Sequence, residues 1–251
     1  MTAEPRAWEG VLAHIEARLV DGRLRPGDHL PAERALSAEL GVGRSSVREA
    51  IRVLEAMGLV RTQTGSGPTS GAIIVARPVG GMQALMRLQV AASGFPVADV
   101  VRTRLLLETA VADELAERPG AVGLADAGQL LDAMDDPALT PQEFLALDAQ
   151  FHLALADASG NTVVAATMAG LRTSIEGYVL AGLARITDWE AMAARLRAEH
   201  RAVVEAIGAG DAAAARTRVH AHISGYYRDA FPSDPDSEPA IAITTATHES
   251  R

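Results

Sequence analysis

Apolar residues recur at the spacing of an α-helix in three stretches near the start of the chain. The first runs from Trp8 to Val20, and the second opens at Pro31-Ala32-Glu33, where Pro and an acid suit a first helical turn. The third ends at Gly58, and either Ser45 or Ser46 can cap its start. The pattern therefore predicts three short helices in succession.

Two short β-prone runs follow these helices. Residues 59–64 and 73–75 flank a glycine-rich turn that begins at Gly65-Ser66-Gly67, which is the pattern of a hairpin. Three helices followed by a hairpin is the element order of a winged helix-turn-helix, expected over residues 1–77. Pro78-Val79-Gly80-Gly81 has the composition of a linker.

After the linker, the pattern is helical almost throughout, and no second set of strands is indicated. Helices are expected at residues 82–92, 96–117, 122–135, 141–158, 161–184, 188–208 and 211–230. The final stretch, 232–251, mixes Ser, Asp, Pro and Thr, a composition typical of disorder. The predicted fold is therefore mostly α, with the winged helix-turn-helix ahead of an all-α antiparallel helical bundle over residues 82–231.

Charge is divided unevenly between these two parts. The net charge is −9, but residues 1–77 hold 10 Arg against 9 acidic residues, whereas the rest hold 13 Arg against 23. The acidic total therefore does not exclude DNA binding by the first part. The chain has no cysteine, which excludes disulfides and thiolate metal sites. It has neither a bilayer-length apolar run nor the features of a signal peptide, so a cytoplasmic location away from membranes is expected.

The third helix carries candidate DNA contacts. In a helix-turn-helix, this helix lies in the major groove with its N-terminal residues at the base edges. Arg44, Ser45, Ser46 and Arg48 occupy that leading turn, and Arg34 on the preceding helix is expected beside the same groove. Arg can bind guanine bidentately, and Ser can reach phosphates or bases. Each Arg alone could belong to an ordinary solvated helix face, but their clustering at this helix start favours DNA binding.

The turn of the hairpin supplies a second set of candidate DNA contacts. Gly65, Ser66 and Gly67 are small, so the backbone at the wing tip can approach a phosphate or the minor groove without obstruction from Cβ atoms.

These N-terminal segments resemble the GntR family of transcription regulators. The resemblance is carried by Leu24–Arg34, Leu40–Ala50 and Leu54–Val60, which cover the turn, both helices and the start of the wing in order. It implies that the Arg and Ser residues named above contact DNA. The sequence departs from the family pattern at two places. Gly43 stands where the family usually has Ser or Thr, and the wing over Gly65–Ala72 is longer than the common form.

Polar residues also recur on apolar helix faces in the second part. Asp148 and His152 are four residues apart and share a face, and His200 and His222 lie in line with apolar residues on two other helices. Unpaired buried polar groups cost roughly 1–3 kcal/mol each, and one divalent ion would satisfy all four. A single such His is better interpreted as a hydrogen-bonded core residue, but the set favours a metal site. His220 must face elsewhere and is expected to be exposed.

The second part resembles the FCD ligand-sensing domain of the FadR subfamily. The matching pieces are Arg104–Glu108, Asp148–His152, Ala158–Asn161, Glu199–Val203, Gly210-Asp211 and His222. The resemblance implies that the Asp and three His named above are ligands of a divalent metal, with zinc first and nickel or manganese as alternatives. It also implies that Arg104 receives the carboxylate of an effector and that Asn161 contributes to the pocket. A salt bridge from Arg104 to Glu108 is the structural alternative, and the two roles are compatible.

Together these features predict a homodimeric transcription regulator, a repressor in preference to an activator. It would bind double-stranded operator DNA and respond to a small organic acid at the metal site. Two alternatives stay open. A metal-dependent hydrolase or isomerase could use the Asp/His set, although the sequence offers no further general base. A constitutive DNA-binding protein could carry a purely structural metal.

Overall fold

The computed structural model describes residues 6–63, 71–75, 81, 84–86, 88–89, 92, 95–118 and 124–231. The chain divides into two compact units, Met1–Met86 and Arg87–Arg251, and each is described by itself. The predicted wing tip at residues 65–67, most of the linker and the C-terminal tail at residues 232–251 lie outside the described residues.

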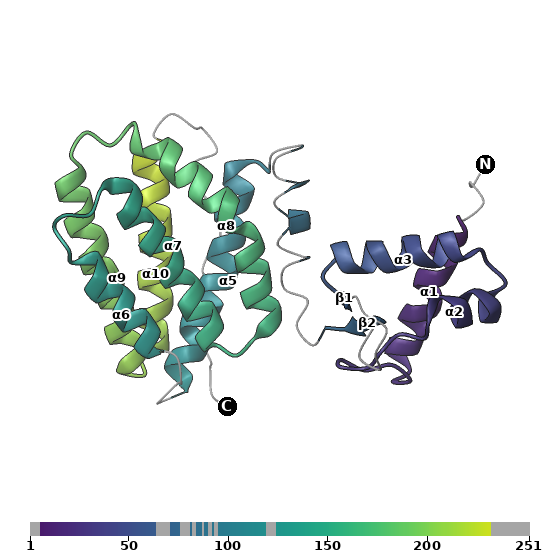
Figure 1. Ribbon diagram of the computed structural model, residues 1–251. Helices are drawn as coiled ribbons and strands as arrows, with labels where there is room; N and C mark the ends of the chain where they lie inside the picture. The colour runs from purple at the N-terminus through teal and green to yellow at the C-terminus, as the bar shows by residue number, and fades with distance from the viewer. Residues whose placement is uncertain are drawn as a thin grey trace, which may run out of the picture. The chain divides into compact units, whose positions relative to one another are not determined.

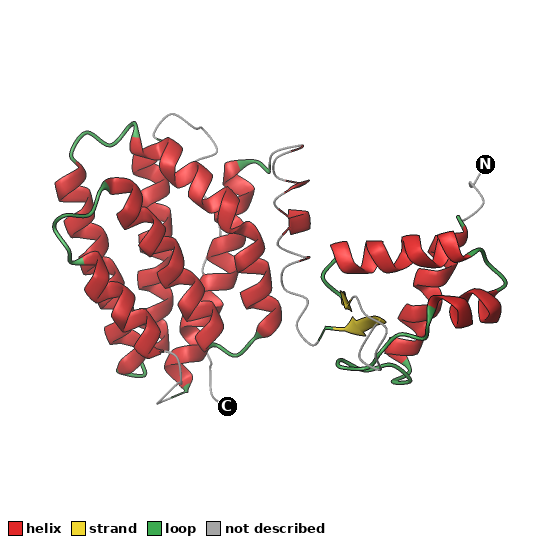
Figure 2. Cartoon of the chain, viewed as in Figure 1, coloured by secondary structure: helices red, strands yellow, loops and turns green. Residues whose placement is uncertain are grey.

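Up to residue 75, the described residues of the first unit form three helices and a two-stranded antiparallel hairpin (Figures 1 and 2). Its elements are α1 (Ala7–Val20), α2 (Glu33–Leu40), α3 (Arg44–Ala56), β1 (Val60–Gln63) and β2 (Gly71–Ile74). The strand register pairs Val60 with Ile74 and Gln63 with Gly71. The apolar faces expected from the sequence enclose a common core that includes Ile15, Leu36 and Val47. The predicted winged helix-turn-helix is therefore confirmed.

The connection between α2 and α3 differs from the expectation in one respect. Gly41 ends α2 in the left-handed region (φ 65°), which glycine adopts without steric cost. The predicted cap of α3 by Ser45 or Ser46 is wrong, because α3 begins at Arg44 and its N-cap is Gly43. Both serines therefore lie in the first helical turn, and neither hydroxyl caps the helix.

The second unit is all-α, as predicted (Figure 2). Its helices are α5 (Val97–Glu117), α6 (Leu124–Met134), α7 (Pro141–Ala158), α8 (Thr162–Leu183), α9 (Trp189–Gly208) and α10 (Ala212–Ala230). Helix α5 is central, since it packs against α7, α8, α9 and α10 (Figure 1). The residues described between 81 and 92, which belong partly to the first unit and partly to the second, are also helical. Within the described part of the chain, no helix is long and apolar enough to cross a membrane.

Helix α7 illustrates how the sequence places polar groups inside this bundle. Thr140 caps its N-terminus, and Glu143 completes a capping box with Pro141 in the first turn. Within the helix that begins here, Phe144 and Phe151 are buried, and so are the polar residues Asp148 and His152. The polar residues on that face are described next.

Candidate metal centre and nucleic-acid interface

Four polar side chains from three helices converge inside the second unit. Asp148 and His152 project from α7, His200 from α9 and His222 from α10, and one ligand atom of each lies within 4.8 Å of all the others. Each residue is at most 6% exposed. The i, i+4 spacing on α7 puts two of these groups on one face. The convergence expected from helical phase is therefore observed.

The facing atoms are three imidazole nitrogens and one carboxylate oxygen. His222 Nε2 lies 3.1 Å from His152 Nε2 and 3.2 Å from His200 Nε2. Asp148 Oδ1 lies 2.9 Å from His200 Nε2 and 3.9 Å from the Nε2 atoms of the other two rings. Two nitrogens that each lie about 2.1 Å from one ion are separated by roughly 3.0–3.4 Å at ordinary coordination angles. The spacing therefore suits the ligands of a single metal ion.

Carboxylates behind two of the rings set their tautomers. His152 Nδ1 lies 2.5 Å from Glu108 Oε2, and His222 Nδ1 lies 2.8 Å from Glu199 Oε2. Because an ionised carboxylate can only accept a hydrogen bond, each neutral ring carries its proton on Nδ1. The Nε2 lone pairs of His152 and His222 then face one another with no proton between them. A cation among these nitrogens resolves that repulsion, so the donor set fits a metal ion.

Electrostatics set the charge states of two of the candidate ligands. Burial alone would raise the pKa of Asp148, but its hydrogen bond with His200 and the other imidazoles hold that pKa well below its usual range. Burial, followed by the neighbouring His222, lowers the pKa of His200 to about 4, against the opposing effect of Asp148. Metal ions bind ionised carboxylates and neutral imidazoles. At neutral pH these two residues therefore already have the required charges.

A buried arginine adjoins the cluster. Arg104 on α5 is 4% exposed, and its Nε donates to Glu108 Oε1 at 2.7 Å while its Nη1 donates to the Tyr178 hydroxyl at 2.6 Å. Burial alone would raise the pKa of Glu108, but Arg104 and His152 together lower it to about 2. The Arg104–Glu108 salt bridge considered from the sequence is present. It also joins the arginine to one of the cluster histidines.

The start of α3 in the first unit presents a basic surface. Arg34, Arg44, Ser45 and Arg48 are exposed, whereas Ser46 is half-buried. These side chains project from α2 and from the first turns of α3, where a helix-turn-helix meets the base edges. Arg48 is not isolated. Its guanidinium binds the Glu33 carboxylate at the start of α2, with nitrogen–oxygen distances of 2.9 and 3.2 Å.

Two family models match these two units. Residues 8–69 match the model described as bacterial regulatory proteins, gntR family, and residues 99–225 match the FCD domain. The chain belongs to the GntR family and carries an FCD domain. The winged helix-turn-helix is therefore the DNA-binding part of a transcription regulator, and the buried Asp/His cluster lies within the FCD domain.

Relatives cover most of the chain. A protein of Escherichia coli (strain K12), named as the proposed regulator of an L-lactate dehydrogenase operon, is 29% identical and aligns over 95% of this chain and 92% of its own length. The regulator Mce2R of Mycobacterium tuberculosis is 30% identical over 83% of this chain and 85% of its own. LutR of Bacillus subtilis is 29% identical over 83% and 97%. These are transcription regulators and not enzymes.

A solved structure agrees with this assignment. The GntR protein of Streptococcus agalactiae superposes with a TM-score of 0.61 at 26% identity, covering 86% of this chain and 96% of that one. Both domains of the GntR-family architecture are therefore represented in this comparison.

Three residues of the FCD site were not assigned a role toward the metal from the sequence. Glu108 was considered only as a partner of Arg104, and its contact with His152 joins α5 to α7. Glu199 adjoins His200 in sequence yet contacts His222 on α10. Tyr178 of α8 reaches Arg104 across the bundle. Each contact links two helices, and helical periodicity within one helix contains no signal for it.

The two remaining polar candidates lie elsewhere. Asn161 is exposed and caps α8, where its side-chain oxygen accepts from the backbone N–H groups of Val163 and Val164. Its contribution to an effector pocket therefore stays a prediction. His220 is outside the metal-type cluster, as expected, but the expectation that it is exposed is wrong. It is half-buried, and its Nε2 has no hydrogen-bond partner among the described residues.

Proposed function

We propose that this GntR-family protein is a homodimeric repressor whose operator affinity is controlled by a small carboxylate effector bound at a metal site in the FCD domain. Asp148, His152, His200 and His222 hold a divalent ion, zinc in preference to nickel or manganese. The donor set of imidazoles and a carboxylate, with Nε2 spacings of 3.1 and 3.2 Å, supports this role. The ion would supply a positive centre for an effector oxygen.

The observation that carries the proposal is the direct connection between Arg104 and the cluster. Glu108 contacts Arg104 at 2.7 Å and His152 at 2.5 Å, all within the buried interior. A guanidinium can bind a carboxylate bidentately, and Arg104 has donors beyond those used by Glu108 and Tyr178. An acid that bound both the ion and this arginine would therefore have two anchors.

The names of relatives support the effector class and the direction of control. One relative is named for an L-lactate dehydrogenase operon, and another, NanR of Citrobacter rodentium, is named as a transcriptional repressor. We therefore place small hydroxy- and dicarboxylic acids first. In the DNA-binding domain, we assign operator contacts to Arg34, Arg44, Ser45, Ser46 and Arg48, together with the wing tip at Gly65, Ser66 and Gly67.

The first experiment is a thermal-shift screen of the zinc-loaded full chain against L-lactate and a panel of other small hydroxy- and dicarboxylic acids. A ligand present at 100 times its dissociation constant adds about 2.7 kcal/mol to the stability of the folded state. We expect a hit that disappears when zinc is chelated. Arg104→Lys keeps the positive charge but loses the bidentate guanidinium, so it should reduce the thermal shift produced by that acid. Arg102→Lys on the same helix should leave the shift unchanged.

The second experiment connects this site to DNA. An operator is first selected from a random duplex library with the zinc-loaded protein, and its affinity is then measured with and without the hit. We expect a lower affinity in the presence of the acid, and linkage requires DNA to weaken acid binding by the same factor. An operator affinity that ignores every acid in the panel would instead establish a constitutive DNA-binding protein with a structural metal.

A further inference from the structure

Glu199 stands behind one candidate metal ligand and also reaches solvent. Its Oε2 lies 2.8 Å from His222 Nδ1, on the side of the ring opposite the cluster. Its side chain is 29% exposed, whereas that of Glu108, the carboxylate behind His152, is 6% exposed. Among the described residues, His200 Nδ1 has no hydrogen-bond partner. Glu199 is therefore the carboxylate through which the surface can influence the cluster.

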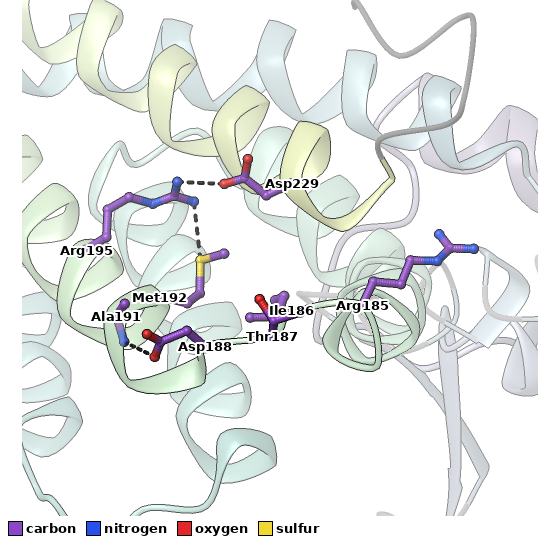
Figure 3. Close-up of a pocket in the computed structure, with 8 residues that line it drawn as sticks. All are labelled: Arg185, Ile186, Thr187, Asp188, Ala191, Met192, Arg195 and Asp229. Carbon is purple, nitrogen blue, oxygen red and sulfur yellow. Dashed lines mark hydrogen bonds and ion pairs between the residues drawn. The ribbon is translucent and has the colours of Figure 1, made fainter.

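A surface arginine contacts the second oxygen of this carboxylate. Arg195, one helical turn before Glu199 on α9, places its Nε 3.4 Å from Glu199 Oε1. Its Nη1 donates to Asp229 Oδ2 on α10 at 2.6 Å. Arg195 and Asp229 line a pocket of about 320 Å³ between the α8–α9 loop and the end of α10, and Figure 3 shows them facing one another there. Continuous contacts thus run from this pocket to His222.

We propose that Glu199 is a positioning residue for His222 and that Arg195 tunes its effect from the surface pocket. This inference rests on the metal centre proposed above. By accepting from Nδ1, the Glu199 carboxylate fixes the tautomer that directs the Nε2 lone pair of His222 into the cluster. Its negative charge also strengthens that nitrogen as a donor to a cation. Arg195 offsets part of this charge, so its removal strengthens the donor.

The test compares zinc affinities of full-length variants by competition with a chromophoric chelator. Replacing the outer partner of a metal-ligating His typically costs about 10–100-fold in metal affinity. We expect Glu199→Gln to show a loss in that range. Glu205→Gln, an exposed charge on the same helix, should leave the affinity unchanged. The cobalt-loaded form should show altered visible absorption bands for Glu199→Gln only, because a change in the donor strength of His222 changes the ligand field.

Arg195→Met tests the tuning step. We expect severalfold tighter zinc binding, because the Arg195 guanidinium no longer offsets the negative charge of Glu199 behind His222. Arg201→Met is the matched control, since Arg201 lies on the same helix and pairs with Asp135, the residue that follows α6. Unchanged or weaker zinc binding by Arg195→Met would overturn the role of Arg195.

The remaining outcomes separate the two proposals. A wild-type chain that binds neither zinc nor cobalt would overturn the metal centre itself. If the wild type binds zinc and Glu199→Gln binds it with the same affinity, only the positioning role of Glu199 is overturned. If the metal-free Glu199→Gln protein unfolds at a lower temperature than the wild type, Glu199→Asp decides the matter. This variant retains the charge and should recover part of the zinc affinity and the cobalt spectrum, and a failure to recover either would count against positioning.

Discussion

Glu108 and His152 lie 2.5 Å apart, Oε2 to Nδ1, and the other oxygen of the same carboxylate binds Arg104. One buried side chain therefore serves both a candidate metal ligand and the candidate effector arginine. The pKa of Glu108 is lowered to about 2, so the group remains ionised throughout the physiological range. One oxygen of this carboxylate faces the Arg104 guanidinium, and the other faces the His152 ring.

Glu108→Gln should weaken zinc and acid binding together. The amide loses the negative charge that holds Arg104 and that selects the Nδ1–H tautomer of His152, and zinc affinity should fall by about 10–100-fold. Titration with zinc, followed by titration of the loaded protein with the acid identified in the screen, measures both effects. Glu114→Gln on the same helix is the control, since Glu114 pairs with Arg118 near the surface. A normal zinc affinity in Glu108→Gln would mean that Glu108 does not support the metal site and acts on Arg104 alone.

Helical phase was sufficient to predict which residues form the buried cluster, because each of them lies among apolar residues of its own helix. Asp148 and His152 face the core for the same reason as Phe144, and the prediction needed no knowledge of neighbouring helices. The carboxylates behind the rings could not be found in this way. Glu199 directly precedes His200 and so points in a different direction, and its partner His222 is on α10. That pairing arises only when α9 packs against α10.

Local errors in the prediction have equally local causes. Serine is a favoured N-cap residue, so Ser45 or Ser46 was expected to begin α3, but the backbone enters the helix at Gly43. His220 was expected to be exposed because it is two residues from His222, which turns it through about 200° on a helix of 3.6 residues per turn. The opposite face of α10 is nonetheless partly covered, and His220 is half-buried there.

A pair of histidine variants tests whether phase identifies ligands. His200→Ala should lose bound zinc, because its Nε2 lies 3.2 Å from His222 Nε2 and 2.9 Å from Asp148 Oδ1. His220→Ala should retain zinc at the wild-type stoichiometry, because this ring is not part of the cluster. Metal content after gel filtration, measured by mass spectrometry, provides the comparison. Equal losses in the two variants would mean that the zinc is held somewhere other than this cluster.

The ion pair between Glu33 and Arg48 gives a prediction about DNA. Arg48→Ala should weaken operator binding by about 1–3 kcal/mol if the guanidinium reads a base. Glu33→Gln should instead tighten binding to unrelated duplex DNA, because the carboxylate no longer neutralises Arg48 next to the groove. Fluorescence anisotropy with operator and scrambled duplexes measures both effects. Arg23→Ala removes an equal charge from the loop after α1 and should change neither affinity. If Arg23→Ala and Arg48→Ala lose the same operator affinity, Arg48 contributes only through its charge and does not contact a base.

The metal-free FCD domain should lose stability as the pH falls from about 6.5 towards 4. His200 has a folded-state pKa of about 4 against 6.5 for the free side chain, so between these values the unfolded chain binds more protons. The contribution of His200 is therefore complete above pH 6.5 and is lost as the pH approaches 4. Glu108, lowered from 4.5 to about 2, adds a further loss below pH 4.5.

This pH dependence can be measured in the FCD domain of the full chain. Trp8 and Trp189 are the two tryptophans, and Trp189 packs edge-on against Phe144 at 5.6 Å between ring centroids. In a Trp8→Phe background, fluorescence during urea unfolding with chelator present therefore reports on this domain alone. His200→Gln should flatten the slope of stability against pH between pH 6.5 and 4.5. A slope that persists unchanged in His200→Gln would assign the upper transition to another group, because only His200 has been removed.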